Sequence, residues 1–98
     1  MAQFDVFRLS DGSLVLDCQS ETIDPYETRF VVPLIEAEPD MVTMPRLHPR
    51  FRIAGDDVVM VTQFATAIRA SELRTRVGSL VQERLKIVTA IDVLIGTA

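Results

Sequence analysis

Apolar residues recur at two different spacings along this chain, and the change from one spacing to the other restricts its fold most strongly. Up to residue 64 they occur in short segments that are typical of β-strands, either alternating, as in residues 3–8, or continuous and β-branched, as in residues 29–34. From residue 79 they recur at every third or fourth position, which is the period of an amphipathic helix. The pattern predicts a mainly β protein with an α-helix at its C-terminal end.

Two β-hairpins are predicted from the turn-forming residues between these short segments. Residues 3–8 and 14–19 flank the sequence SDGS, and residues 50–53 and 58–64 flank AGDD. Asp and Gly favour tight turns because their backbones tolerate a positive φ, so each pair of segments is expected to form antiparallel strands.

The connections between the hairpins carry the prolines. A turn is predicted at 24–27, followed by a strand over 29–34 whose Pro33 should lie at the strand's end or edge, because proline cannot donate to a β-ladder. Residues 36–49 contain three prolines and are predicted to form a long loop. Residues 68–77 combine helix formers with alternation, and we predict one short strand there.

The segment from residue 79 to residue 95 is the clearest helix. Ser79 is the candidate N-cap, and Gln82, three residues later, completes the spacing of a capping box. Gly96 is expected just after the helix end, where glycine adopts a left-handed backbone most easily. The apolar stripe is wider than a surface helix needs, and consists of Val81, Leu85, Val88, Ile91 and Ile95, joined by Leu80, Ile87 and Leu94.

A chain of 98 residues is long enough for a single hydrophobic core, so we expect one domain over residues 1–98. Its residues are 48% hydrophobic and its mean hydropathy is +0.24, both high for a small monomer that must cover its surface with polar groups. Part of the apolar surface is therefore expected to meet a partner, and a homodimer is the simplest case.

The net charge of −4 limits the classes of partner. An acidic chain sets up no general positive field for nucleic acid backbones or anionic membranes, so we expect neither as a main partner. The single cysteine, Cys18, excludes an internal disulfide and a zinc cluster and is expected in the core, and we predict no cofactor. Without a signal peptide or a long apolar span, the expected location is the cytoplasm.

The one histidine lies in a basic stretch, RLHPRFR. If this stretch were extended, four side chains would share one face at a period of two, namely Arg46, His48, Arg50 and Arg52. Such a row could bind an anion or cleave RNA, or it could be a solvated basic edge that discourages strand aggregation. The residues by themselves leave these three interpretations open.

Six short blocks in one order resemble the CcdB toxins of toxin–antitoxin pairs along nearly the whole chain. The blocks are QF at residues 3–4; Asp17, Gln19, Ser20, Ile23 and Asp24 in the pattern D-x-Q-S-x-x-I-D; Arg29, Val31, Pro33 and Leu34 in R-x-V-x-P-L; Leu47 and Pro49 in L-x-P; Met60 and Thr62 in M-x-T; and AID at residues 90–92. The resemblance implies an SH3-like, partly open antiparallel barrel with a small inserted sheet and a C-terminal helix, assembled as a two-fold homodimer.

The resemblance also implies a function without catalysis. CcdB-like toxins bind the A subunit of DNA gyrase while it holds cleaved DNA, and so they block religation. In this chain the corresponding gyrase-binding positions are Thr22, Ile23, Asp92, Ile95, Gly96, Thr97 and Ala98. The family commonly ends in an aromatic residue followed by Gly-Ile, whereas this chain has Gly96, Thr97 and Ala98, so a weakened or retargeted toxin stays open as an alternative.

The resemblance gives the basic stretch another use. CcdB-like toxins are captured by a disordered, often acidic segment of a cognate CcdA-like antitoxin, which folds on binding. The residues expected to bind it are Arg46, His48, Arg50 and Arg52. A MazF-like endoribonuclease toxin, which shares the same barrel, is the alternative from another class. Its candidate phosphate-binding groups are Arg29, His48 and Thr62.

Overall fold

The computed structural model describes residues 2–23 and 27–97. Within them lie seven β-strands: β1 (Asp5–Arg8), β2 (Leu14–Asp17), β3 (Thr28–Glu36), β4 (Arg50–Ile53), β5 (Asp56–Met60), β6 (Thr66–Arg69) and β7 (Thr75–Ser79). One α-helix, α1 (Arg84–Ile95), follows them. Short 3-10 turns are η1 (Glu21–Ile23), η2 (Thr62–Phe64), η3 (Ala70–Glu72) and η4 (Val81–Glu83). The turn predicted at 24–27 falls mainly on 24–26, outside the described residues.

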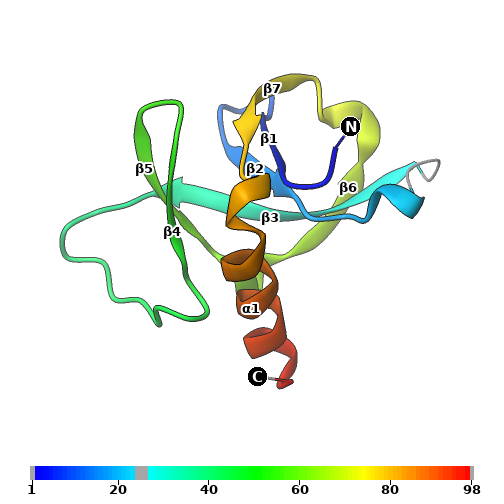
Figure 1. The fold of residues 1–98 in the computed structure, drawn as a ribbon. Helices are drawn as coiled ribbons and strands as arrows, with labels where there is room; N and C mark the ends of the chain where they lie inside the picture. The colour runs from blue at the N-terminus through cyan, green and yellow to red at the C-terminus, as the bar shows by residue number, and fades with distance from the viewer. Residues whose placement is uncertain (1, 24–26, 98) are drawn as a thin grey trace.

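The strands form one antiparallel sheet that curls into a half-barrel (Figure 1). The order is β4-β5-β3-β2-β1-β7, and β6 pairs with β3 beside this path. The long strand β3 therefore organises the sheet, because it pairs with β2 along one side and with β6 and then β5 along the other. The prediction of a mainly β, partly open antiparallel barrel with a C-terminal helix is confirmed. The small inserted sheet is not separate, since β5 pairs with residues 34–36 at the end of β3 and so belongs to the same sheet.

The larger hydrophobic core lies between the curled sheet and the first half of α1. On the helical side it contains Leu80, Ile87 and Ala90, all of them buried. Full burial of an isoleucine side chain stabilises a fold by about 1.5–3 kcal/mol, so Ile87 is a main attachment of the helix. The strand side includes Phe4, Val6, Leu16, Val32, Leu34, Phe51, Ile53, Val58 and Met60.

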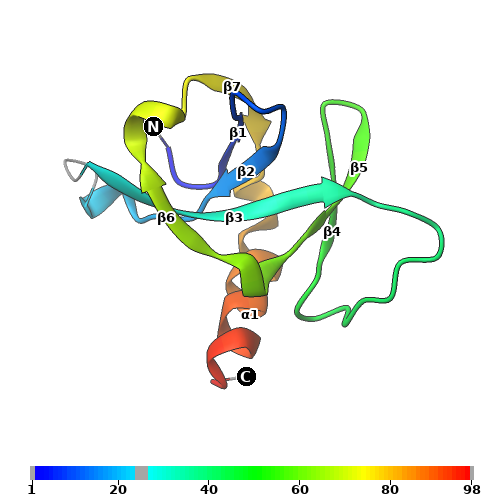
Figure 2. The ribbon, with the colours of Figure 1, turned by 180° about the vertical axis from the view of Figure 1, so that it is seen from behind.

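The predicted apolar stripe of the helix is only partly the buried face. Val81, Leu85 and Ile95 are exposed, whereas the buried positions Ile87 and Ala90 lie on the neighbouring face. The last turn of α1 also extends past the sheet in both views (Figure 2). A stripe wider than the core requires therefore leaves apolar side chains on the surface, as the composition indicated.

The prediction is confirmed at the C-terminal end of the helix and is wrong at its start. The prediction of a capping box at Ser79 is wrong, because Ser79 is still the last residue of β7. Its Oγ accepts the N–H of Val81, the first residue of η4, at 3.2 Å. The end at Gly96 is confirmed, with a left-handed φ of 85°. The N–H of Gly96 donates to the carbonyl of Val93 at 3.3 Å and that of Thr97 to the carbonyl of Asp92 at 2.9 Å, which is a Schellman motif.

Pro33 lies inside β3 and not at its end, but it pairs with β2 on one side only, so the edge position allowed by the prediction is the one observed. β6 pairs with residues 28–31 and β5 with residues 34–36, so Pro33 lies where the second partner of β3 changes. Its carbonyl accepts the N–H of Val61 at 2.9 Å, outside any strand ladder. Because the N–H and C=O of one residue point to the same side of a strand, the missing N–H faces this interruption.

Two strands replace the single one predicted over residues 68–77. β6 pairs with β3 and β7 pairs with β1, and η3 turns the chain between them. The long loop predicted at 36–49 is confirmed from residue 37 onwards, and both predicted hairpins are present with shifted ends. In the second hairpin, Ala54 and Gly55 both have positive φ, as a tight two-residue turn requires.

Candidate functional site

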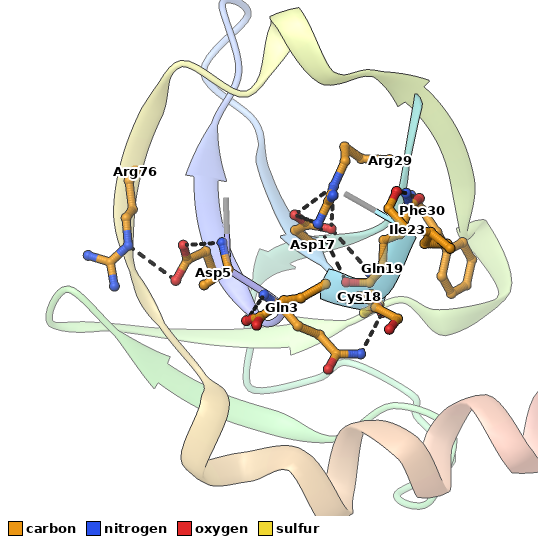
Figure 3. A network of polar contacts seen from close by, with 12 residues as sticks. Gln3, Asp5, Asp17, Cys18, Gln19, Ile23, Arg29, Phe30 and Arg76 are labelled. Atoms are coloured by element: carbon orange, nitrogen blue, oxygen red, sulfur yellow. Dashed lines mark hydrogen bonds and ion pairs between the residues drawn. The ribbon is translucent and has the colours of Figure 1, made fainter. Parts of the chain in front are cut away.

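A buried ion pair lies directly behind the loop that carries Thr22 and Ile23. The Nη2 of Arg29 is 2.7 Å from the Oδ2 of Asp17, and neither side chain is exposed to solvent (Figure 3). The Nε of Arg29 also donates to the same carboxylate at 3.0 Å. The other oxygen of Asp17 accepts the backbone N–H of Gln19 at 3.1 Å, so the pair reaches into the loop.

Gln19 connects this ion pair to the exposed part of the loop. Its Oε1 accepts the N–H of Phe30 in β3 at 2.8 Å, and its Nε2 donates to the carbonyl of Ile23 at 3.2 Å (Figure 3). Ser20 and Thr22 share a hydroxyl hydrogen bond of 2.8 Å at the surface. The loop therefore presents Thr22 and Ile23 on a backbone fixed from behind, and the D-x-Q pattern of the sequence has a structural explanation.

Gln3 ties the same loop to the start of the helix. Its backbone N–H donates to the Oε1 of Glu21 at 3.2 Å and its Nε2 to the carbonyl of Cys18 at 3.1 Å. Its Oε1 accepts from the Nη1 of Arg84, the first residue of α1, at 3.1 Å. The guanidinium of Arg84 also lies over the ring of Phe4, 5.4 Å from its centre. Sequence analysis did not single out Gln3, although it is part of the QF block.

The second group of predicted gyrase-binding residues lies at the tip of α1. Ile95 is 64% exposed, Gly96 and Thr97 are exposed and Asp92 is half-buried. The Schellman turn fixes their backbone, and the hydroxyl of Thr97 also donates to the carbonyl of Asp92 at 3.3 Å. Ala98, the last residue predicted for this group, lies outside the described residues. The result is a defined tip at which Ile95 is the large apolar side chain among the predicted residues.

One protomer does not bring these two groups together. η1 lies beside the sheet near the start of β3, while the tip of α1 points away from the sheet, and both views show them apart (Figures 1 and 2). A surface that includes both groups therefore requires a second copy of the chain.

The basic residues do not form the extended row that their spacing predicted. Residues 44–48 make a turn instead, in which the N–H of His48 donates to the carbonyl of Met44 at 2.7 Å. The N–H of Met44 in turn donates to the Nδ1 of His48 at 3.0 Å. Only Arg50 and Arg52 share a face, on β4, and the Nη1 of Arg52 is paired with the Oδ1 of Asp57 at 3.1 Å.

The structure nevertheless brings three of these residues to one hollow. Arg46, His48 and Arg50 line a depression of about 510 Å³ between residues 43–50 and the helix. Its other wall is formed by three residues of α1 that sequence analysis did not assign to this site, Leu85, Lys86 and Thr89. Their position in the sequence gave no sign of this, because nothing local relates residue 50 to residue 86.

The three residues of the endoribonuclease alternative do not form a solvent-facing site. Arg29 and Thr62 have no exposed surface, and the Oγ1 of Thr62 donates to the carbonyl of Leu47 at 2.5 Å. His48 is held by Met44 and by a contact of 2.8 Å between its Nε2 and the Oε1 of Gln63. Arg29 and Thr62 therefore make their polar contacts inside the fold, and the prediction that they bind a phosphate group is wrong.

Cys18 is buried, as predicted. Burial raises the pKa of its thiol to about 12, and the neighbouring charge of Asp17 acts in the same direction. Across residues 2–23 and 27–97, no group of three or more His, Cys, Asp or Glu side chains is placed to hold a metal ion. In the same part of the chain, no helix is long and apolar enough to cross a membrane.

The fold and these surfaces define a class of small β protein in which exposed loops, a helix tip and a cationic hollow are available for binding. A family model described as CcdB protein matches residues 3–96, and a search of curated proteins finds no match. The chain belongs to the CcdB family. Membership supports, in general terms, the role of a toxin in a toxin–antitoxin system that is directed at DNA gyrase.

Proposed function

We propose that this protein is a toxin that binds the A subunit of DNA gyrase as a homodimer and traps the complex of gyrase with cleaved DNA. The observation that carries the proposal is the fixed, exposed tip of α1, where Ile95 projects from a Schellman turn at Gly96. An inhibitor that stabilises one conformation of its target needs a complementary surface and no activated group. The cytoplasm, where gyrase and DNA are found, is the proposed location.

The arrangement of the two predicted groups supports a homodimer. The η1 segment lies away from the tip of α1 within one protomer, so a two-fold axis would be needed to combine the two groups in one surface. Exposed apolar side chains are available to be buried in such an interface. They include Phe64, Val81, Leu85, Leu94 and Ile95.

The small terminal residues leave less anchoring energy than an aromatic residue would supply. Burying the exposed 64% of Ile95 contributes about 1–2 kcal/mol per copy, and a two-fold axis uses it twice. An aromatic anchor is commonly worth more than about 2 kcal/mol by itself. We therefore expect gyrase binding that is weaker than that of relatives with the aromatic ending.

The proposal includes a CcdA-like antitoxin as the second partner. Its acidic segment would meet the basic residues next to the helix, which were predicted as Arg46, His48, Arg50 and Arg52. Three of them line the hollow beside α1, which supports a common binding surface.

Calorimetric titration into the dimerisation domain of the host's gyrase A subunit tests the proposal. We expect saturable binding by the full chain and loss of binding by Ile95→Asp, because a buried carboxylate at the tip would lack a partner. Val42→Asp is the matched control, since Val42 is 96% exposed in the loop before β4 and belongs to neither group. Absence of binding at about 50 µM, or equal effects of the two variants, would contradict the proposal and favour the retargeted dimer.

A further inference from the structure

A second hollow, which we call the Arg8–Arg74 hollow, lies at the end of the sheet away from the tip of α1 (Figures 1 and 2). One wall is formed by residues 8–10 and the other by residues 71–75, and Arg8 of β1 is directly paired with Thr75 of β7. The hollow has a volume of about 430 Å³. Sites for small molecules commonly measure about 300–1,000 Å³, so this one has room for more than a single ion.

Two guanidinium groups line the Arg8–Arg74 hollow, and each is held by a backbone carbonyl. The Nη1 of Arg8 donates to the carbonyl of Gly12 at 3.0 Å, and the Nε of Arg74 donates to the carbonyl of Ser71 at 3.1 Å. Across residues 2–23 and 27–97, neither arginine forms an ion pair. Their remaining N–H groups are therefore available to an anion, and two positive charges in one concave site attract it.

Three hydroxyl groups lie in the same lining, those of Ser10, Ser71 and Thr75. Among the described residues, none of these hydroxyls takes part in a hydrogen bond. A phosphate group offers three strongly accepting oxygens, whereas a carboxylate offers only two. Two guanidinium groups together with several hydroxyl donors therefore match a phosphate group better than a carboxylate.

The acidic residues near the hollow are not paired with these arginines. The Oδ1 of Asp11 accepts both the N–H and the Oγ–H of Ser13, at 2.9 and 2.6 Å. Glu72 does line the hollow, and its Oε2 accepts the N–H of Arg69 at 3.3 Å. A carboxylate in this position repels a bare phosphate ion, but it accepts a hydrogen bond from a hydroxyl group next to a bound phosphate. Glu72 therefore favours a ligand that carries both groups.

We propose that the Arg8–Arg74 hollow binds a small phosphate monoester, with its phosphate on Arg8 and Arg74 and a hydroxyl group of its organic part on Glu72. A monoester carries a charge of about −1.5 to −2 at pH 7, which suits two guanidinium groups. The inference does not rest on the proposed function, because the hollow shares no residue with the predicted gyrase-binding or antitoxin-binding sets.

A small molecule fits this lining better than a nucleic acid strand. Single-stranded nucleic acid is usually held by bases stacked on aromatic side chains, and none of the described lining residues is aromatic. A strand also places phosphates side by side, so one of them would approach the carboxylate of Glu72. The net charge of −4 on the whole chain opposes a long polyanion further.

A titration followed by nuclear magnetic resonance of the ¹⁵N-labelled full chain tests the inference. The probe is ribose 5-phosphate, and inorganic phosphate and ribose are the comparison ligands, all at one ionic strength. We expect ribose 5-phosphate to cause saturable shifts of the backbone amide signals of Ser10, Ser71 and Thr75. Inorganic phosphate should bind several-fold more weakly because it has no organic hydroxyl group for Glu72, and ribose should cause no shift.

Variants assign the binding to this hollow. Combining Arg8→Gln with Arg74→Gln should weaken ribose 5-phosphate binding by about tenfold or more. Glu72→Gln should strengthen the binding of inorganic phosphate and reduce the preference for ribose 5-phosphate to less than about twofold, because it removes the repelling charge. Arg52→Gln is the control and should change binding by less than about twofold, since Arg52 is exposed and lines a different hollow. Circular dichroism with a thermal melt verifies that each variant is folded.

Four results would overturn the inference. The first is the absence of saturable shifts with ribose 5-phosphate at up to about 10 mM. The second is an equal loss of binding in the Arg52→Gln control. The third is weaker binding of both phosphates by Glu72→Gln, and the fourth is tighter binding of a single-stranded DNA of about 12 nucleotides through the same arginines. No gyrase is present in these assays, so their failure leaves the gyrase titration, and the claim it tests, unaffected.

Discussion

Replacing Arg29 by methionine tests the structural basis of the exposed loop at Thr22 and Ile23. The guanidinium of Arg29 is fully buried and lies 2.7 Å from the carboxylate of Asp17. Methionine fills much of the volume but removes the positive charge. The carboxylate of Asp17 would then keep the N–H of Gln19 as a donor but would lose the charge that compensates its burial.

The magnitude follows from the burial of both partners. Breaking a buried ion pair by removing one partner costs about 3–5 kcal/mol, because the remaining charge is left unpaired in the interior. A domain of this size has a total stability of about 5–15 kcal/mol, so the variant should lose a large part of it. The exposed pair of Arg52 and Asp57, whose side chains are each 68% exposed, should contribute less than about 1 kcal/mol.

Urea unfolding followed by circular dichroism at one protein concentration measures both effects. The midpoint of Arg29→Met should fall by about 2 M or more, while that of Arg52→Met should stay within about 0.5 M of the parent chain. Arg29→Lys, which keeps the charge but not the paired donors, should fall between them. Similar midpoints for Arg29→Met and Arg52→Met would refute the view that the buried pair stabilises this region.

Two further outcomes follow from other parts of the core. Gly78→Val should lower stability by about 1–3 kcal/mol, because even a Cβ at residue 78 would lie 2.7 Å from the Cδ1 of the buried Ile53. A thermal melt that matches that of the parent chain would contradict this contact. Cys18 should stay unmodified by iodoacetamide at pH 8 in the folded protein, because its buried thiol has a raised pKa of about 12 and is protonated at that pH. The thiol should react once urea unfolds the chain. Rapid labelling of the folded protein, measured by mass spectrometry, would count against its burial.

Local signals in the sequence predicted the turns of the two hairpins and the end of the helix. Gly96 defines the helix end because a left-handed residue and two backbone hydrogen bonds within one turn are sufficient to stop α1. The helix start was not predictable in the same way. Ser79 has the chemistry of an N-cap, but its backbone pairs with Asp5 in the sheet, and this long-range pairing delays the helix to Arg84.

Sequence spacing relates candidate site residues only within one segment. Ile95, Gly96 and Thr97 are contiguous and exposed, which supports the proposed gyrase contact without testing it. The prediction of a basic row failed because the backbone N–H of Met44 donates to the Nδ1 of His48 and favours a turn, whereas period-two spacing assumes an extended chain. The helical wall of the cationic hollow could not be found from spacing, since packing of α1 against the sheet alone places Lys86 near Arg50.

The central claim is that this protein traps gyrase on cleaved DNA, and a cleavage assay tests it most directly. Purified protein is added to gyrase, supercoiled plasmid and ATP, the reaction is stopped with detergent and protease, and linear DNA is measured. The account predicts that linear DNA accumulates with the parent chain and with Val42→Asp but not with Ile95→Asp. A level of linear DNA that does not rise above that of gyrase alone, at toxin concentrations where calorimetry finds the A subunit saturated, would contradict it.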